Sequence, residues 1–577
     1  MRMIVFSRKL LKPYWKLILL VVILELGQAF LTLYLPTLNA GIIDYGTVHA
    51  DMEYVSRIGV VMLILSFVQF VFNVMCSFLG SKIAMMAGRD LRAKTYKKIL
   101  SLSQREVASF GAPTLITRAT NDAQQIVQFY MIFFTRIINA PIMFIGGMFL
   151  ALSQDLMLSS VIFITIPILV VIAFLFVKNI VPFYRTKQTK IDLLNGVLRD
   201  QITGMRVVRA FNKEDFEKNK MEDANEQLFH LNLAIGYATA LLVPIFTLIV
   251  SFSKIALLWL GGSMATGGQV QIGMINAFVT YTSFILSATL IASMVFIQLP
   301  KADVSAERLD EIFNTECSVK DDESAKDIDI PDNAPVRFDH VSFSYAPENK
   351  DVRMVLEDIS FTAYPGQMTA IIGSTGSGKS TLINLISRFA DVTGGSILLG
   401  DTDIRNIKLP KLLSMIGLVP QKSYMFSGTL EKNLRYAKKD ATDKELWEAL
   451  KVAQADDFIR EKDGQLNMIV SEGGSNYSGG QRQRLCIARA VVRKPRIFLF
   501  DDSFSALDSA TDKKLREALK PITKDSIYIV VAQRIGSIKD ADQIIVMNEG
   551  RIADIGRHDE LVERCSVYRE IVASQPQ

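Results

Sequence analysis

The pattern of apolar and polar positions divides the chain into two halves. Six long apolar stretches lie within the first three hundred residues, at 17–38, 58–80, 129–152, 156–177, 233–260 and 274–299. A helix needs about 20 apolar residues to cross a bilayer, so the pattern predicts an all-α membrane domain with six transmembrane helices. From Val336 onward, short β-branched runs alternate with helical runs, which is typical of an α/β domain.

Basic residues predict the orientation of the six helices. Lys and Arg are frequent in residues 1–16, 81–128 and 178–230 and nearly absent from the other connections. By the positive-inside rule, we expect both termini and both long connections in the cytoplasm. From the compact length and the lack of targeting extensions, we expect a multi-pass protein of the cell membrane, either a plasma or a bacterial inner membrane. Helical periodicity continues through these connections, which predicts long cytoplasmic extensions with crosswise segments at Pro113–Ala123 and Val207–Phe216.

The same pattern sets the expected domain boundaries. The membrane domain should occupy residues 1–313, and an acidic, proline-punctuated linker should follow at 314–335. The second domain should occupy 336–577. Within it, residues 422–485 read as an all-helical insertion, with Thr442 and Glu445 spaced as a capping box.

Composition excludes several classes of function. Half of the residues are hydrophobic and the mean hydropathy is +0.26, which indicates contact with a lipid bilayer. The net charge is +5, but the basic residues flank apolar stretches without interleaved aromatic residues, so no nucleic-acid partner is expected. Four widely separated cysteines indicate a reducing compartment and no cysteine-ligated metal site.

A glycine-rich loop provides the first candidate site. The stretch GSTGSGKST follows a β-rich apolar run and precedes an amphipathic one, the context in which G-x-x-x-x-G-K-[ST] binds nucleoside triphosphates. Backbone N–H groups and a helix N-terminus would hold the phosphates, the lysine would reach the β and γ phosphates, and the following serine would bind Mg²⁺. The candidate residues are Gly373, Ser374, Thr375, Gly376, Ser377, Gly378, Lys379, Ser380 and Thr381.

Two further motifs extend this site into a family pattern. The run YSGGQRQRL begins at Tyr477, and RIFLFDD ends at Asp502. With the phosphate loop, these motifs make the whole chain resemble the ATP-binding cassette (ABC) transporters, specifically exporter half-transporters in which six membrane helices are fused to one α/β P-loop nucleotide-binding domain with a helical subdomain. The resemblance implies ATP and Mg²⁺ as ligands and ATP-driven transport as the activity.

The resemblance also assigns roles to single residues. It implies that Tyr345 stacks on adenine, that Gln421 senses Mg²⁺ and that Asp501 binds Mg²⁺. Tyr345 and Gln421 also have structural interpretations, as a strand aromatic and a surface polar residue. The residues implied to reach ATP bound on an opposite cassette are Ser478, Gly479, Gly480 and Gln481.

Two positions depart from the family pattern. The family has a glutamate as the base after the Mg²⁺-binding aspartate, where this chain has Asp502, and a histidine where this chain has Gln533. Aspartate is one methylene shorter, and misplacing a base by about 1 Å can cost on the order of 100-fold in rate. A glutamine amide does not titrate. The sequence therefore predicts a site that binds ATP without efficient hydrolysis, and a heterodimer whose other half-transporter carries the glutamate and histidine.

The transported substrate is less well defined. A drug or other small amphiphile is the first hypothesis, and a lipid, peptide or siderophore is the second. An ATP-gated channel or regulator is the third, because Asp502 and Gln533 are compatible with ATP as a ligand only. Glu25 and Lys254 lie within apolar stretches and are candidates for substrate contact, although Glu25 is equally suited to helix pairing; Arg136 lies near a span end, where it can snorkel.

Overall fold

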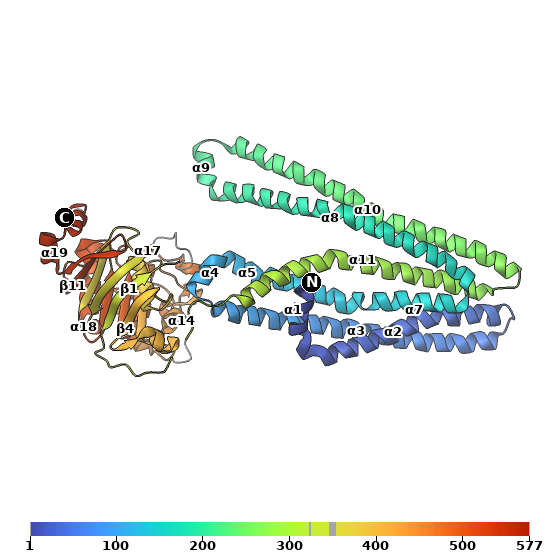
Figure 1. Ribbon diagram of the computed structural model, residues 1–577, viewed down its shortest axis with the longest axis horizontal. Coiled ribbons are helices and arrows are strands. Elements are labelled where there is room, and N and C mark those ends of the chain that lie inside the picture. Colours follow the sequence, from blue (N-terminus) through green and yellow to red (C-terminus); the bar gives the residue numbers. More distant parts are fainter. Residues whose placement is uncertain (1, 322–324, 346–353, 576–577) are drawn as a thin grey trace. The chain divides into compact units, whose positions relative to one another are not determined.

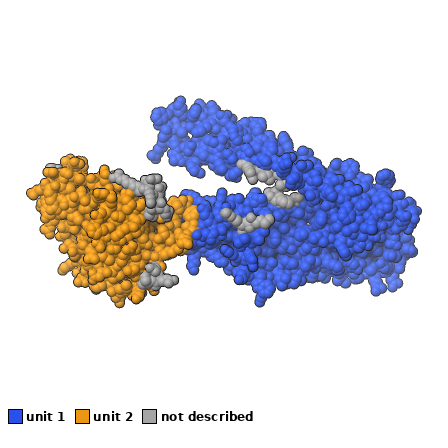
Figure 2. All heavy atoms as spheres, viewed as in Figure 1, with its two compact units in different colours: residues 1–100, 113–314 blue, residues 101–112, 315–577 orange. Residues whose placement is uncertain are grey.

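The chain folds into two compact units. The computed structural model describes residues 2–321, 325–345 and 354–575. Unit 1 comprises Met1–Leu100 and Pro113–Asn314, and unit 2 comprises Ser101–Ala112 and Thr315–Gln577 (Figures 1 and 2). A short segment from the first long connection thus belongs to the unit that contains the α/β domain.

The described part of unit 1 consists of helices joined by short turns. Its helices are α1 (Arg2–Leu11), α2 (Trp15–Gly41), α3 (Met52–Leu100), α5 (Ala112–Thr117), α6 (Ala123–Ile132), α7 (Asn139–Gln154), α8 (Leu156–Thr203), α9 (Met205–Ala210), α10 (Glu214–Thr266) and α11 (Ile272–Asn314). Among the residues that the structure describes, six helical runs are long and apolar enough to cross a membrane, which confirms the predicted number of spans. In Figure 1, α8 and α10 run side by side, joined by α9, and diverge from the other helices of this unit toward the α9 end.

One predicted crosswise segment was misplaced. The short helix in the first connection is α4 (Gln104–Phe110), whereas 113–123 continues into the helical run of the third span. A capping box of Ser103 and Glu106 starts α4, and Gly111, at φ 77°, ends it. In the second connection, the short helix α9 covers only the first part of Val207–Phe216, because α10 already begins at Glu214.

Unit 2 is an α/β domain with two main sheets. The mixed sheet has the order β12-β11-β3-β10-β9-β6, with only β12 antiparallel, and the antiparallel sheet has the order β2-β1-β4-β5. Its strands are β1 (Val336–Phe343), β2 (Leu356–Ala363), β3 (Met368–Gly373), β4 (Gly394–Leu399), β5 (Thr402–Asp403), β6 (Ile416–Val419), β9 (Ile497–Asp501), β10 (Ile527–Val531), β11 (Gln543–Asn548) and β12 (Arg551–Gly556). All five side chains of β9 and of β10 are buried, as expected for central parallel strands.

Helices complete unit 2. They are α12 (Lys379–Ile386), α13 (Leu409–Met415), α14 (Leu430–Arg435), α15 (Asp443–Val452), α16 (Asp456–Arg460), α17 (Gly479–Arg493), α18 (Ser509–Thr523), α19 (His558–Arg564) and α20 (Ser566–Ala573). The predicted capping box of Thr442 and Glu445 is present. The insertion between β6 and β9 is not wholly helical, because β7 (Gly428–Thr429) pairs with β8 (Ile469–Val470). Two-residue strands carry too little periodicity to be seen in the sequence.

Candidate functional site

The phosphate loop joins β3 to α12 at the carboxyl edge of the parallel strands. Gly378 has φ 97°, and a Cβ there would lie 2.5 Å from Leu356 Cδ2, so only glycine fits. At Gly373, a Cβ would lie 2.3 Å from the carbonyl oxygen of Met547. The loop is therefore closely packed against β2 and β11, which keeps its backbone N–H groups in place.

Lys379 is folded back into this loop. Its Nζ donates to the carbonyl oxygens of Gly373 and Ser374 at 2.9 and 2.7 Å, and its side chain is largely buried. Burial lowers the pKa of Lys379, while the carboxylates of Asp502 and Asp501 oppose that shift. The ammonium group thus lies where phosphate oxygens would enter.

Four neighbouring strands bring the other predicted residues to the same edge. Gln421 follows β6, Asp501 ends β9 and Gln533 follows β10, and these strands flank one another and β3. Carboxyl ends of parallel strands form the usual ligand crevice of such sheets. A cavity of about 290 Å³ lies at the ends of these four strands. Its lining residues are Val355, Thr375, Gly376, Gly378, Lys379, Ser380, Thr381, Gln421, Asp501, Asp502, Val531 and Gln533.

Ser380 and Asp501 present oxygen atoms suited to a hard divalent cation. Ser380 Oγ donates to Asp501 Oδ1 at 3.0 Å. Burial raises the pKa of Asp501, and the hydrogen bond from Ser380 opposes that rise. No cluster of three or more His, Cys, Asp or Glu able to hold a metal occurs among the described residues. A Mg²⁺ ion here would need phosphate oxygens to complete its coordination, and the hydroxyl and carboxylate present fit that role.

Asp502 is the most heavily hydrogen-bonded residue of the site. Its Oδ2 accepts from Gln533 Nε2 at 2.9 Å and from Gln421 Nε2 at 3.4 Å. Its backbone is in the left-handed region, at φ 49°, and its N–H donates to Val531 O. Burial raises the pKa of the Asp502 carboxyl, while hydrogen bonds from Gln421 and Ser505 oppose that rise. The carboxylate at the base position is therefore engaged by two amides.

Sequence reasoning missed two further partners of Asp502. Gln483 Nε2 and Ser505 Oγ donate to the backbone oxygen of Asp502 at 3.4 and 3.0 Å. Gln483 is buried on α17. Gln483 lies two residues after Gln481 in the run YSGGQRQRL, so the motif marks its neighbourhood. The sequence does not show that its side chain contacts Asp502.

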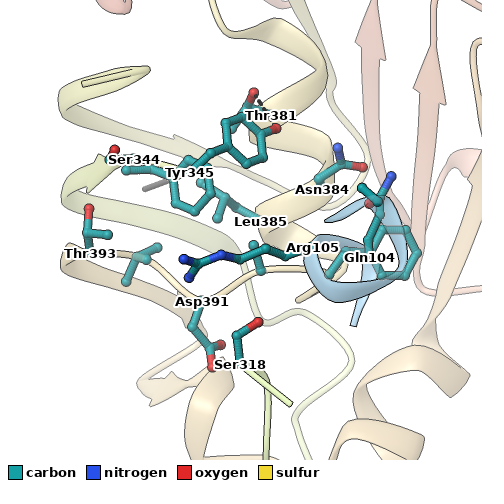
Figure 3. Close-up of a pocket in the computed structure, with 15 residues that line it drawn as sticks. Gln104, Arg105, Ser318, Ser344, Tyr345, Thr381, Asn384, Leu385, Asp391 and Thr393 are labelled. Carbon is teal, nitrogen blue, oxygen red and sulfur yellow. Dashed lines mark hydrogen bonds between the residues drawn. The ribbon is translucent and has the colours of Figure 1, made fainter. Parts of the chain in front are cut away.

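Tyr345 lines a second, adjacent pocket. This cavity of about 470 Å³ shares Thr381 with the first one, and Tyr345 Oη lies 3.2 Å from Thr381 Oγ1. Figure 3 shows Asn384 and Leu385 of α12 and Gln104 and Arg105 of α4 on its walls. A nucleotide with phosphates on the loop would pass Thr381 and place its base beside the tyrosine ring. The contribution of α4 was not foreseen.

The residues Ser478–Gln481 do not line either pocket. They begin α17, where Ser478 Oγ accepts from Gln481 N and Gln481 Oε1 accepts from Ser478 N, both at 3.2 Å. This capping box fixes the helix N-terminus and leaves its partial positive charge available to an anion outside these pockets.

Tyr477 is expected to limit the stability of unit 2. The residue is 5% exposed, and its hydroxyl has no hydrogen-bond partner among the residues that the structure describes. The Lys462 ammonium lies 4.8 Å from the ring centroid. An unpaired buried hydroxyl costs about 1–3 kcal/mol, so Tyr477→Phe should raise the free energy of unfolding by about 1 kcal/mol while keeping the cation–π contact. Thermal unfolding of the solubilised protein measures this, with Tyr477→Leu as the control that also loses the ring; a destabilised Phe variant would contradict the expectation.

The charged residues of the spans differ in environment. Glu25 on α2 is 2% exposed, and Asn139 Nδ2 on α7 donates to its Oε2 at 2.8 Å, which supports the helix-pairing interpretation over substrate contact. Lys254 is half-buried on α10, and Arg136 is exposed.

Comparison with known proteins agrees with this architecture. Residues 18–290 match the ABC transporter transmembrane region family and residues 356–505 match the ABC transporter family. The chain is 43% identical to an uncharacterized ABC transporter ATP-binding protein of Mycobacterium tuberculosis over 98% of this chain and 97% of that protein. It is 31% identical to the uncharacterized ABC transporter ATP-binding protein YfiB of Bacillus subtilis, with 98% and 97% coverage.

The similar proteins also include one that is named by its function and one whose structure has been solved. A multidrug efflux ATP-binding/permease protein of Mycobacterium bovis is 28% identical over 96% of this chain, which spans 46% of that protein. A bacterial Atm1-family ABC exporter with ATP bound has the same fold, with a TM-score of 0.82, 23% identity and coverage of 97% and 98%. The chain therefore belongs to the ABC transporter family, as an exporter-type half-transporter in which a transmembrane region and an ATP-binding domain form one polypeptide.

Proposed function

We propose that this chain is the degenerate-site subunit of a heterodimeric exporter. It would move amphiphilic drugs or similar small molecules out of the cytoplasm by alternating access, with both termini on the cytoplasmic side of the cell membrane. The observation that carries the proposal is the state of Asp502, whose Oδ2 is engaged by the amides of Gln533 and Gln421. A carboxylate held by two non-titrating amides is poorly placed to accept a proton from water.

ATP would nevertheless bind tightly at this site. The phosphate loop and Lys379 would hold the phosphates, Ser380 and Asp501 would hold Mg²⁺ with Gln421 beside them, and Tyr345 would stack on the base. Bound Mg²⁺ would neutralise phosphate charge. All these groups lie in two pockets that meet at Thr381. What the site lacks is the glutamate and the histidine that family members have at the positions of Asp502 and Gln533.

The connection between the fourth and fifth spans supports a dimer. Apolar side chains are exposed in the second long connection, which runs from the end of α8 through α9 to the start of α10. This connection is rich in basic residues and is expected to lie outside the bilayer. Exposed apolar surface of this kind marks a contact with another protein. The residues are Leu193, Leu198, Ile202, Val207, Phe211, Phe216 and Phe229.

A second half-transporter would supply the competent hydrolytic site. The N-terminus of α17 is capped and ordered, so Ser478, Gly479, Gly480 and Gln481 are ready to complete a site on a homologous partner that carries the glutamate and histidine. A homodimer would have Asp502 and Gln533 in both of its ATP sites, so neither site would hydrolyse ATP efficiently enough to drive transport. Similarity to a multidrug efflux protein supports small amphiphiles as cargo.

Expression of the chain alone and with its co-purifying subunit tests the proposal. We expect the chain alone to bind ATP but to show no ATP-driven uptake of a fluorescent amphiphilic cation into inverted membrane vesicles. Both subunits together should restore uptake and ATPase activity. Robust transport by the chain purified free of any other subunit would contradict the heterodimer, and activation of the pair by lipid alone would contradict the drug substrate.

A further inference from the structure

The loop that follows β10 is held by a side chain from the C-terminal segment. Gln575 Oε1 accepts from the backbone N–H of Ile535 at 2.8 Å, and Gln575 Nε2 donates to the backbone oxygen of Gln533 at 2.7 Å. One primary amide therefore satisfies a donor and an acceptor two residues apart in the loop. Because both ends of the amide are used, its orientation is determined by these bonds.

Gln575 is supported by a well-packed base. It follows α20, whose Tyr568 is fully buried and whose hydroxyl lies 2.8 Å from His558 Nδ1 on α19. Ile571 and Val572 pack against the same hydrophobic cluster as Ile535. The segment that carries Gln575 is therefore anchored in the hydrophobic core beneath the loop. Because this backbone is already ordered, the Gln575 side chain loses little additional entropy when it hydrogen-bonds to the loop.

The held loop carries Gln533, one of the two amides bound to Asp502. The backbone of Gln533 is fixed by Gln575, and its Nε2 donates to Asp502 Oδ2 at 2.9 Å. The next residue, Arg534, donates through Nη1 to Leu507 O at 3.2 Å, which ties the loop to the segment after β9. A continuous chain of hydrogen bonds thus connects the C-terminal segment to the carboxylate beside the phosphate loop.

We propose that Gln575 is a positioning residue of this ATP site. It fixes the loop after β10 so that the Gln533 amide stays hydrogen-bonded to Asp502. Holding this hydrogen bond in place slows the release of bound ATP. This inference rests on the proposed function of the site as one that holds ATP. Gln575 is not among the residues that line either pocket, whereas Gln533 is, so the effect of Gln575 passes through Gln533.

The rate of nucleotide release from the assembled transporter tests the proposal. Gln575→Ala removes both hydrogen bonds to the loop, which predicts release of radiolabelled ATP about 10-fold faster than in the unmodified protein. Gln575→Glu keeps the acceptor for Ile535 but places a carboxylate oxygen against the Gln533 backbone oxygen, so release should be at least as fast as with Ala. Ser574→Ala is the matched control, because the Ser574 hydroxyl donates to Ile571 O within the helix end, and the variant should release ATP at the unmodified rate.

A double-mutant cycle separates positioning from general loosening. In a Gln533→Ala background, adding Gln575→Ala should change the release rate by less than 2-fold, about the limit of resolution of such cycles. An equal effect of Gln575→Ala in both backgrounds, or no effect of Gln575→Ala alone, would overturn the proposal. The identity of the released nucleotide is read in the same experiment. Release as ADP would contradict the proposed function, while the ratio of rates would still decide the role of Gln575.

Discussion

Replacing Asp502 by Glu together with Gln533 by His is expected to raise ATP hydrolysis at this chain's site about 100-fold. The glutamate adds the methylene that brings a carboxylate about 1 Å closer to the γ-phosphate side of the pocket, and a shift of that size is worth on the order of 100-fold in rate. The histidine replaces an amide that now donates to Asp502 Oδ2 at 2.9 Å with a ring that can titrate.

The two substitutions should act as a unit. With Glu alone, Gln533 would still engage the carboxylate, and with His alone the shorter aspartate would still be misplaced, so each single change should gain less than about 10-fold. Single-turnover hydrolysis in the assembled transporter, with the partner's own site inactivated, measures the gain. Asp502→Asn provides the opposite control. If it lowered hydrolysis by the unmodified pair 100-fold, this site would already be an active one and the degenerate-site proposal would fail.

The sequence predicts the helices and the ligand class because both rest on local signals. Six apolar stretches reach spanning length, and the motif around Lys379 specifies a strand, a loop and a helix in that order. The crosswise segment in the first connection was misplaced by about ten residues because apolar periodicity continues through Pro113. The stop at Gly111 depends on a single left-handed residue that periodicity does not register.

The network around Asp502 could not be predicted in the same way. Gln421, Gln483, Gln533 and Gln575 lie on four separate parts of the chain. The sheet order brings the amides of Gln421 and Gln533 to the Asp502 carboxyl group, and the packing of α17 brings Gln483 to its backbone oxygen. A glutamine carries no charge and little periodic signal, so its partner is fixed by tertiary packing alone. The departures at Asp502 and Gln533 were visible in the sequence, but their direct hydrogen bond was not.

Gly479→Ala in the proposed heterodimer is expected to lower ATP hydrolysis on the order of 100-fold. A Cβ added to Gly479 meets no atom within 4 Å in this chain, whereas one added to Gly480 lies 3.1 Å from Ala506 O. Alanine is also a better helix former than glycine, by about 1 kcal/mol in a helix interior. The substitution should therefore leave the fold of this chain intact.

Any loss of activity in Gly479→Ala must then come from what the helix end faces outside this chain. If Ser478–Gln481 complete the partner's site, the added methyl group displaces the N–H groups of α17 from the transferring phosphate by about 1 Å, which is sufficient for the predicted loss. Gly59→Ala, also in open space on a helix, is the matched control and should retain full activity. Steady-state ATPase and thermal unfolding of the same preparations give the comparison. A Gly479→Ala heterodimer with an unchanged unfolding temperature and unchanged hydrolysis would show that this helix end does not serve the active site, and the catalytic asymmetry would have to be sought elsewhere in the pair.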